Sequence, residues 1–160
     1  MINYTQGQLD ELVSCRKEII EPPKKNLVTL RGSRRNDFKA QCEQGRRFSI
    51  FMRINEAFEE DFSIGLMYEP LGDDAVTLLR CNGPHGDVLV SVANPHPHFG
   101  YHIHRALEEN IAAGRRPEAG AAITTEYSSY QQALRYFLGR ANIEWNSKDF
   151  PDISQPSLFQ

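Results

Sequence analysis

All five histidines of this chain lie within twenty consecutive positions, from residue 85 to residue 104. Random placement of five residues would crowd them this tightly only about once in a thousand shuffles, so the tract is locally rich in histidine beyond chance. Imidazole can bind a metal ion, and it can also take up and release protons near neutral pH. The stretch CNGPHGDVLVSVANPHPHFGYHIHRALEE, residues 81–109, is therefore the first place to look for a functional site.

The spacing of polar residues in this tract is that of two strands. In YHIHRAL, an extended backbone places His102 and His104 on the same face, and in LLRCNGPH it does the same for Arg80 and Asn82. We expect the two pairs on one face of neighbouring strands, within reach of each other. His85 follows the second pair in a Gly-Pro loop, which can bring its side chain to the mouth of a cleft.

A metal site is one interpretation of this pattern. A His-x-His pair on a strand suits zinc or another transition metal, with His85, His102 and His104 as the ligands. Such sites usually include a carboxylate or a cysteine as well. Asp87 and Glu108 are the nearby carboxylates, and neither has a diagnostic spacing.

Acid–base chemistry without a cofactor is the interpretation that we favour. Two histidines suffice to cleave RNA through its own 2′-hydroxyl group, since one removes that proton and the other protonates the leaving oxygen. An arginine such as Arg80 then stabilises the pentavalent phosphate anion. The expected catalytic residues are His85, His102, His104 and Arg80. The residues expected to bind phosphate or substrate are Asn82, Arg105, Arg46 and Arg47.

The remaining histidines fit a structural role. His96 and His98 alternate with Pro95 and Pro97, so we expect them in a loop where they cap turns and contact solvent. If the chain were a partner-binding protein rather than an enzyme, the histidines would be interface residues.

Composition indicates a single globular domain. The chain has 160 residues, of which 40% are hydrophobic and 24% charged, so we expect one domain over residues 1–143 and a tail over residues 144–160. No apolar run approaches the length of a membrane span, and the polar N-terminus is unlike a signal peptide, so we expect no membrane association and a cytoplasmic location. The three cysteines lack CxxC spacing. A net charge of −3 excludes a bulk polyanion binder, but arginine, which can fork a phosphate, greatly outnumbers lysine.

Hydrophobic periodicity predicts an α+β fold. The stripe of Leu9, Leu12, Val13, Ile19 and Ile20 predicts an N-terminal helix that ends at two prolines. Alternating or β-rich runs predict an antiparallel meander with strands at 26–32, 36–43, 46–55, 61–70 and 75–83.

A C-terminal amphipathic helix is expected over residues 128–143, packed on the sheet. Its apolar stripe runs from Tyr130 to Ala141, and Ser128 with Gln131 matches a capping box. No glycine-rich phosphate loop of Walker or Rossmann type is present.

The blocks RCNGPHG and HIHRALEE, followed by TTEY at 124–127, resemble a family of uncharacterised bacterial proteins with an Arg-x-Asn-Gly-x-His block and a His-Ile-His block. The resemblance covers roughly residues 75–143. More distantly, the order of these residues resembles TumE-type toxins of bacterial toxin–antitoxin pairs. Arg80, Asn82, Pro84 and His85 match the first block there, and the His102–His104 pair matches the second. In this chain the Pro-His pair lies one residue closer to the arginine, FGY lengthens the second block, and the chain is longer.

These observations lead to three functional hypotheses. The leading one is a toxin-like endoribonuclease of a bacterial or phage defence context, acting on RNA by metal-free histidine and arginine chemistry. The first alternative is a non-enzymatic partner-binding protein, such as an antitoxin-like or inhibitor module. The second alternative is an enzyme that depends on a histidine-bound metal.

Overall fold

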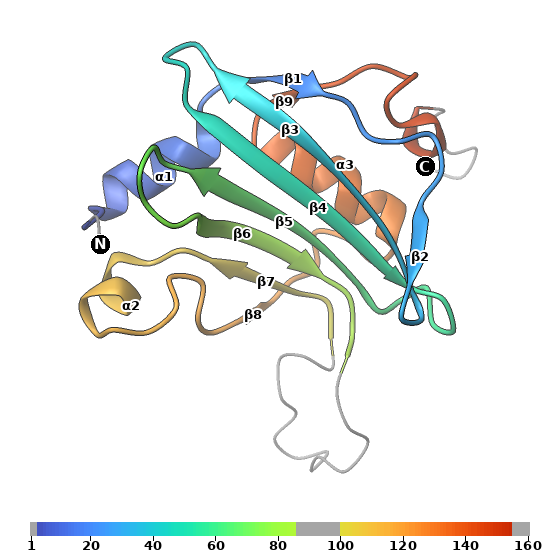
Figure 1. Cartoon of the computed structure of the whole chain (residues 1–160). Helices are drawn as coiled ribbons and strands as arrows, with labels where there is room; N and C mark the ends of the chain where they lie inside the picture. Colours follow the sequence, from blue (N-terminus) through green and yellow to red (C-terminus); the bar gives the residue numbers. More distant parts are fainter. Residues whose placement is uncertain (1–2, 86–99, 155–160) are drawn as a thin grey trace, which may run out of the picture.

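Alternating apolar residues give the central sheet one buried face, and the helices pack on that face. The computed structural model describes residues 3–85 and 100–154, which form an α+β fold (Figure 1). The helices are α1 (Gln6–Ser14), α2 (Glu108–Ala112), α3 (Tyr130–Arg140) and the 3₁₀ helix η2 (Pro151–Ile153). The strands are β1 (Lys17–Glu21), β2 (Val28–Leu30), β3 (Ser33–Cys42), β4 (Arg47–Asn55), β5 (Phe62–Glu69), β6 (Val76–Asn82), β7 (His102–Arg105), β8 (Ala122–Ile123) and β9 (Ile143–Glu144).

The sheet is the expected antiparallel meander with additions at both edges. Its order is β8-β7-β6-β5-β4-β3-β1-β9, and β2 pairs with β3 beside β1. Every pairing is antiparallel except that of β9 with β1, which is parallel. The five strands from β3 to β7 therefore follow one another both along the chain and across the sheet.

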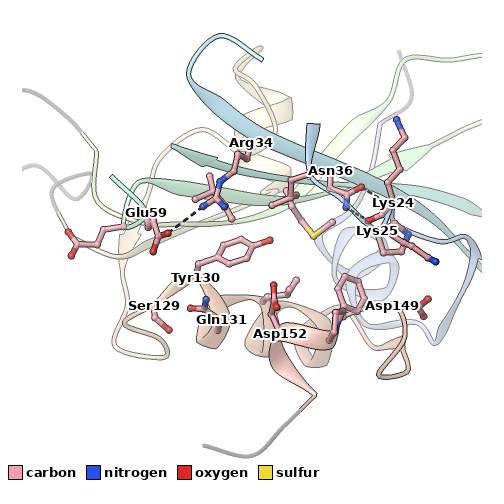
Figure 2. Close-up of a pocket in the computed structure, with 18 of the residues that line it drawn as sticks. Lys24, Lys25, Arg34, Asn36, Glu59, Ser129, Tyr130, Gln131, Asp149 and Asp152 are labelled. Atoms are coloured by element: carbon pink, nitrogen blue, oxygen red, sulfur yellow. Dashed lines mark hydrogen bonds and ion pairs between the residues drawn. The ribbon is translucent and has the colours of Figure 1, made fainter. Parts of the chain in front are cut away.

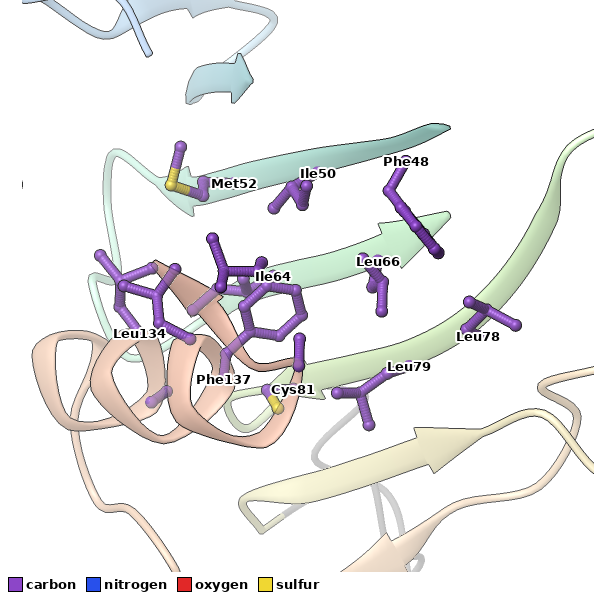
Figure 3. Packing of buried hydrophobic residues seen from close by; sticks show 14 of the residues in the cluster. Phe48, Ile50, Met52, Ile64, Leu66, Leu78, Leu79, Cys81, Leu134 and Phe137 are labelled. Atoms are coloured by element: carbon purple, nitrogen blue, oxygen red, sulfur yellow. The ribbon is translucent and has the colours of Figure 1, made fainter. Parts of the chain in front are cut away.

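The hydrophobic core lies between the sheet and the two longer helices. Strands β4, β5 and β6 contribute a layer of side chains that α3 covers with Leu134 and Phe137 (Figure 3). Leu9 and Leu12 of α1 belong to the same cluster, so both helices lie against the same face. The opposite face is left for polar chemistry, because the polar residues of each strand alternate with the buried ones.

The C-terminal helix is confirmed over Tyr130–Arg140, two residues after the expected start and three before the expected end. The stripe of Ala133, Leu134, Phe137 and Leu138 is buried as expected. The helix cap is Ser129 rather than Ser128. The backbone of Ser129 is extended, and its side-chain hydroxyl accepts a hydrogen bond from the backbone N–H of Gln132.

The N-terminal helix is shorter than expected, since Ile19 and Ile20 lie in β1 and the helix ends at Ser14. The cause is Lys17, which is fully buried. Its ammonium group donates to the carbonyls of Val13, Cys15 and Ala141 at 2.7–2.9 Å. These bonds join the ends of α1 and α3, and burial lowers the pKa of Lys17 to about 8.

The first part of the C-terminal tail packs on the domain. Phe150 and Ile153 are buried in the core, and β9 extends the sheet. Phe159, another aromatic residue of the tail, lies outside the described residues. No helix in the described ranges is both long enough and apolar enough to cross a membrane.

Candidate functional site

Strands β6 and β7 bring the first histidine block and the second together. Arg80 lies directly opposite His104, and Asn82 lies opposite His102. The alternate residues Leu79 and Cys81 point into the core and are fully buried. The juxtaposition predicted from the two-residue spacing is therefore confirmed, on the face of the sheet opposite α3.

Three imidazole rings form a continuous row at this place. The ring centres of His85 and His102 are 4.9 Å apart, and those of His102 and His104 are 5.1 Å apart, with edge-on geometry in both pairs. His102 is fully buried and His104 is 6% exposed, whereas His85 at the end of the row is only partly buried. A ligand that approaches from solvent can therefore reach His85 most easily.

Backbone carbonyl groups define the tautomers of the two strand histidines. Nδ1 of His102 lies 2.8 Å from the carbonyl oxygen of Gly100, and Nδ1 of His104 lies 2.7 Å from that of Gly120. A carbonyl oxygen can only accept a hydrogen bond, so Nδ1 carries the hydrogen in both rings. In the neutral ring, Nε2 is then the nitrogen with the lone pair, which is the arrangement that a general base requires.

Burial also favours the neutral form of His104. Loss of hydration lowers its pKa, and the nearby positive charge of Arg80 acts in the same direction. The bonds from Nδ1 to the carbonyls of Gly120 and Glu118 oppose this shift without cancelling it. His104 is therefore suited to accept a proton at neutral pH rather than to donate one.

This lowered pKa predicts acid sensitivity of the fold. Below the unfolded value of about 6.5, the unfolded chain binds a proton at His104 before the folded chain does. The contribution of His104 to stability is therefore complete above that pH and is lost as the pH falls through the folded pKa. His104→Asn keeps a donor at the Nδ1 position but does not titrate. As the pH is lowered from 7.5, we expect the free energy of unfolding of the wild type to fall more than that of H104N. Urea unfolding at each pH measures the two values. Parallel plots of unfolding free energy against pH for the two proteins would contradict the prediction.

Arg80 is a half-buried cation with donor capacity to spare. One terminal nitrogen lies 3.4 Å from the hydroxyl of Ser63, which itself donates to the side-chain oxygen of Asn82 at 2.8 Å. Nε of Arg80 is buried and has no hydrogen-bond partner among the described residues. Burial lowers the pKa of Arg80, and the buried carboxylate of Glu118 partly offsets this effect. A partly desolvated guanidinium is well suited to bind an oxyanion at its terminal nitrogens.

Two residues that sequence reasoning did not select hold the ends of β6 and β7 in place. The hydroxyl of Tyr127 lies 3.0 Å from the carbonyl of Asn82 and 2.8 Å from that of His102, so it ties the two strands together. Gly83 allows the backbone of Glu60 to approach so closely that a Cβ atom there would lie 1.7 Å from its carbonyl oxygen. Tyr127 belongs to the TTEY block and Gly83 to the RCNGPHG block, and those blocks were their only signals in the sequence.

Three arginines expected at the site are not brought to it. Arg46 forms a two-pronged ion pair with Glu11 at 2.8 and 2.9 Å, at the opposite end of β4. Arg47 is the first residue of β4. It lies six residues, or about 20 Å, from Arg53 at the end of the strand that is nearer the site. Arg105 follows His104 in β7, so its side chain points to the other face of the sheet.

The structure provides no complete set of metal ligands within its described ranges. No group of three or more His, Cys, Asp or Glu side chains is arranged there to hold an ion. Glu108 accepts a hydrogen bond from the backbone of Gln6. Asp87, His96 and His98 lie outside the described residues.

A second feature is a cavity of about 390 Å³ on the helical face of the sheet. Figure 2 shows Lys24, Lys25 and Asn36 on one side of it, and Gln131 and Asp152 on the other. No sequence pattern indicated this cavity, because short segments far apart in the chain line it.

No protein-family model matches this chain, and no curated protein or solved structure matches it either. A function for the chain therefore has to be inferred from the residues of the site themselves.

Proposed function

We propose that the chain is an endoribonuclease that cleaves RNA by acid–base chemistry at the row of His85, His102 and His104. The observation that carries the proposal is the combination of this row with the half-buried guanidinium of Arg80 on one face of the sheet. Acid–base groups close to an anion-binding group are what transfer of a phosphoryl group to a neighbouring hydroxyl requires.

The reaction assigns one role to each group. His102, whose Nδ1 hydrogen faces the Gly100 carbonyl, accepts the proton of the ribose 2′-hydroxyl at Nε2, and because Nε2 is buried in the free protein, the RNA has to open the contact between the rings of His85 and His102 to reach it. The 2′-oxygen then attacks the adjacent phosphorus, and Arg80 stabilises the pentavalent anion. The bond to the 5′-oxygen breaks, and His85 protonates that oxygen. The products are a 2′,3′-cyclic phosphate and a 5′-hydroxyl.

His104 and Asn82 support these groups from behind. His104 contacts the ring of His102 and is held by the Gly120 carbonyl, so it limits the orientations open to His102. Asn82 accepts from Ser63, which in turn contacts Arg80. These contacts place the guanidinium next to the imidazole row.

The resemblance to TumE-type toxins supports a biological setting for this activity. In that setting the chain acts in the cytoplasm of a bacterium, in a toxin–antitoxin or phage defence system, and an antitoxin is its protein partner.

The test is a time course of cleavage on mixed single-stranded RNA, with and without a chelator. We expect wild type to cut RNA, chelator to leave the rate unchanged, and Arg80→Lys to lower it, because an ammonium group cannot fork two phosphate oxygens. Arg47→Lys, on the same sheet face but remote from the row, should cut like wild type. Loss of cleavage in chelator would instead support the histidine-bound metal, and an absence of cleavage would contradict the proposal.

A partner-binding protein is the second candidate, and strand β2 is the observation that favours it. All three of its residues are exposed, including Val28 and Leu30, and β3 is its only partner among the described strands. An exposed apolar strand of this kind can pair with a strand of another protein. A chain that cuts no RNA but forms a stable complex with a cognate partner would support this candidate.

A further inference from the structure

We propose that the face of the sheet opposite α3 is a track for single-stranded RNA, with Phe51 as the platform on which a base stacks. The inference rests on the proposed function, because it names the form of substrate that the imidazole row receives. It depends on two adjacent rows of side chains that cross the sheet, which we call the arginine row and the phenylalanine row.

The arginine row runs across five neighbouring strands. Successive cross-strand partners are Arg35 on β3, Arg53 on β4, Ser63 on β5, Asn82 on β6 and His102 on β7. At about 4.8 Å between strands, the row spans roughly 19 Å. It leads from the exposed Arg35 toward the central imidazole, and because Ser63, Asn82 and His102 are buried, Arg35 and Arg53 are the members of this row that solvent reaches.

Two arginines of this face lie next to each other across neighbouring strands. Arg35 and Arg53 are direct cross-strand partners, and like charges in that position destabilise a sheet. The charge of Arg53 also acts on Arg80 and lowers its pKa, after the larger effect of burial. Asp61 offsets part of the charge of Arg53, at 3.5 Å. A bound polyanion would remove the remaining repulsion, so this arrangement suits a phosphate backbone.

The phenylalanine row supplies a flat aromatic surface beside these cations. The row begins at the exposed carboxylate of Asp37 on β3, which faces Phe51 on β4. Phe51 faces Gly65 on β5, and the row continues through Arg80 on β6 to His104 on β7. The ring of Phe51 lies over Gly65 so closely that a Cβ atom there would be 2.1 Å from the ring. Gly65 therefore lets the ring lie down on the sheet over β5, the strand between those that carry Arg53 and Arg80.

Aromatic rings combined with a basic surface recognise single strands rather than duplexes. An unpaired base can stack on a ring, and every base has a face that can do so. In a duplex those faces are covered by neighbouring bases. The geometry thus places a base on Phe51, its phosphates on Arg53 and Arg80, and the bond to be cut near His85 and His102.

The experiment measures binding of a labelled 2′-O-methyl RNA strand, which cannot be cut because its 2′-oxygen carries no proton. Phe51→Leu should weaken binding by about 5- to 100-fold, whereas Phe51→Tyr, which keeps the ring, should bind like wild type. Gly65→Ala should also weaken binding, because it lifts the ring without changing any charge. Arg53→Gln should weaken binding and reduce the slope of log K against log salt by about 0.7.

Arg47→Gln is the matched control for Arg53→Gln, because Arg47 lies on the same strand and the same face as Arg53, about 20 Å from it. Its affinity for the strand should equal that of wild type. Equal affinity for a duplex, unchanged binding by F51L, or equal losses in R47Q and R53Q would overturn the track. So would a wild-type protein that binds only an acidic protein partner.

The two proposals fail in different ways. If the protein binds the 2′-O-methyl RNA in a manner that depends on Phe51 but does not cleave natural RNA, the endoribonuclease proposal is contradicted and the track proposal is supported. Cleavage that depends on His85 and His102, with a KM unaffected by F51L, would leave the endoribonuclease standing and overturn the track.

Discussion

His85→Ala and His102→Ala are each expected to lower the rate of RNA cleavage by roughly 10²–10⁴, the usual effect of losing a general acid or base. The expectation follows from the row geometry, in which the rings of His85 and His102 are 4.9 Å apart and His85 is the more exposed. One ring must act neutral and the other protonated, so removal of either stops one proton transfer. Initial rates under saturating RNA measure the effect.

The pH dependence separates the two roles. Wild-type activity should follow a bell with limbs on either side of about 6.5, the value of an unperturbed imidazole. Residual activity of H102A should lose the acidic limb, because the base that must be deprotonated is gone. Residual activity of H85A should lose the alkaline limb, because the acid that must be protonated is gone.

Matched controls make this result specific to the row. His98→Ala removes a histidine that the sequence assigns to a solvent-facing loop, and it should cut RNA like wild type. Both row variants should still bind the 2′-O-methyl strand, because the phosphates are assigned to arginines. Row variants that cut like wild type, or an H98A variant as inactive as H85A, would contradict the assignment of acid and base.

The elements that form the site could be predicted because each signal is local. A period of two along YHIHRAL and LLRCNGPH places His102, His104 and Arg80 on one face, whichever fold surrounds them. The pairing of Arg80 with His104 required in addition that β6 and β7 be antiparallel neighbours in the observed register. The helical stripe that ends near Ala141 is equally local, so α3 was predicted almost to its ends.

The incorrect predictions arise from partners that are distant along the chain. Arg46 has a side chain of the type that commonly binds phosphate, but its partner in the structure is Glu11, 35 residues away in the sequence. The end of α1 is determined by Lys17, whose buried ammonium bonds to Ala141 at the far end of the chain. Residue type alone does not say which charge meets which, because the register of the whole sheet decides it.

The phenylalanine row illustrates the same limit. In the sequence, Phe51 falls on the polar face of an alternating strand, and Gly65 interrupts another strand without explanation. The two residues acquire a meaning only when β4 and β5 pair and the ring covers the glycine. A bulky aromatic on the polar face of a strand, with a glycine on the next strand, is a signal that sequence reasoning could have used.

Phe137→Ala is expected to lower the free energy of unfolding by about 3–5 kcal/mol, the usual cost of deleting a fully buried ring. The side chain is completely buried, and Figure 3 shows it pointing from α3 toward Ile64 on the sheet, with Cys81 nearby. The vacated space lies between a helix and a sheet that are each tied to other elements, so it can close only in part. At about 2–4 °C per kcal/mol, the loss in Tm is large enough for a thermal unfolding scan to resolve.

Phe58→Ala is the matched control, because it deletes the same ring from the turn between β4 and β5, where Phe58 is 69% exposed. Its unfolding free energy should stay within about 0.5 kcal/mol of wild type. The difference between F137A and F58A therefore measures burial against the sheet rather than loss of an aromatic residue. An F137A variant that unfolds at the wild-type temperature would mean that α3 does not cover the core in solution. The polar face on the other side of the sheet would then lose the rigid support that its rows of arginine, phenylalanine and histidine require.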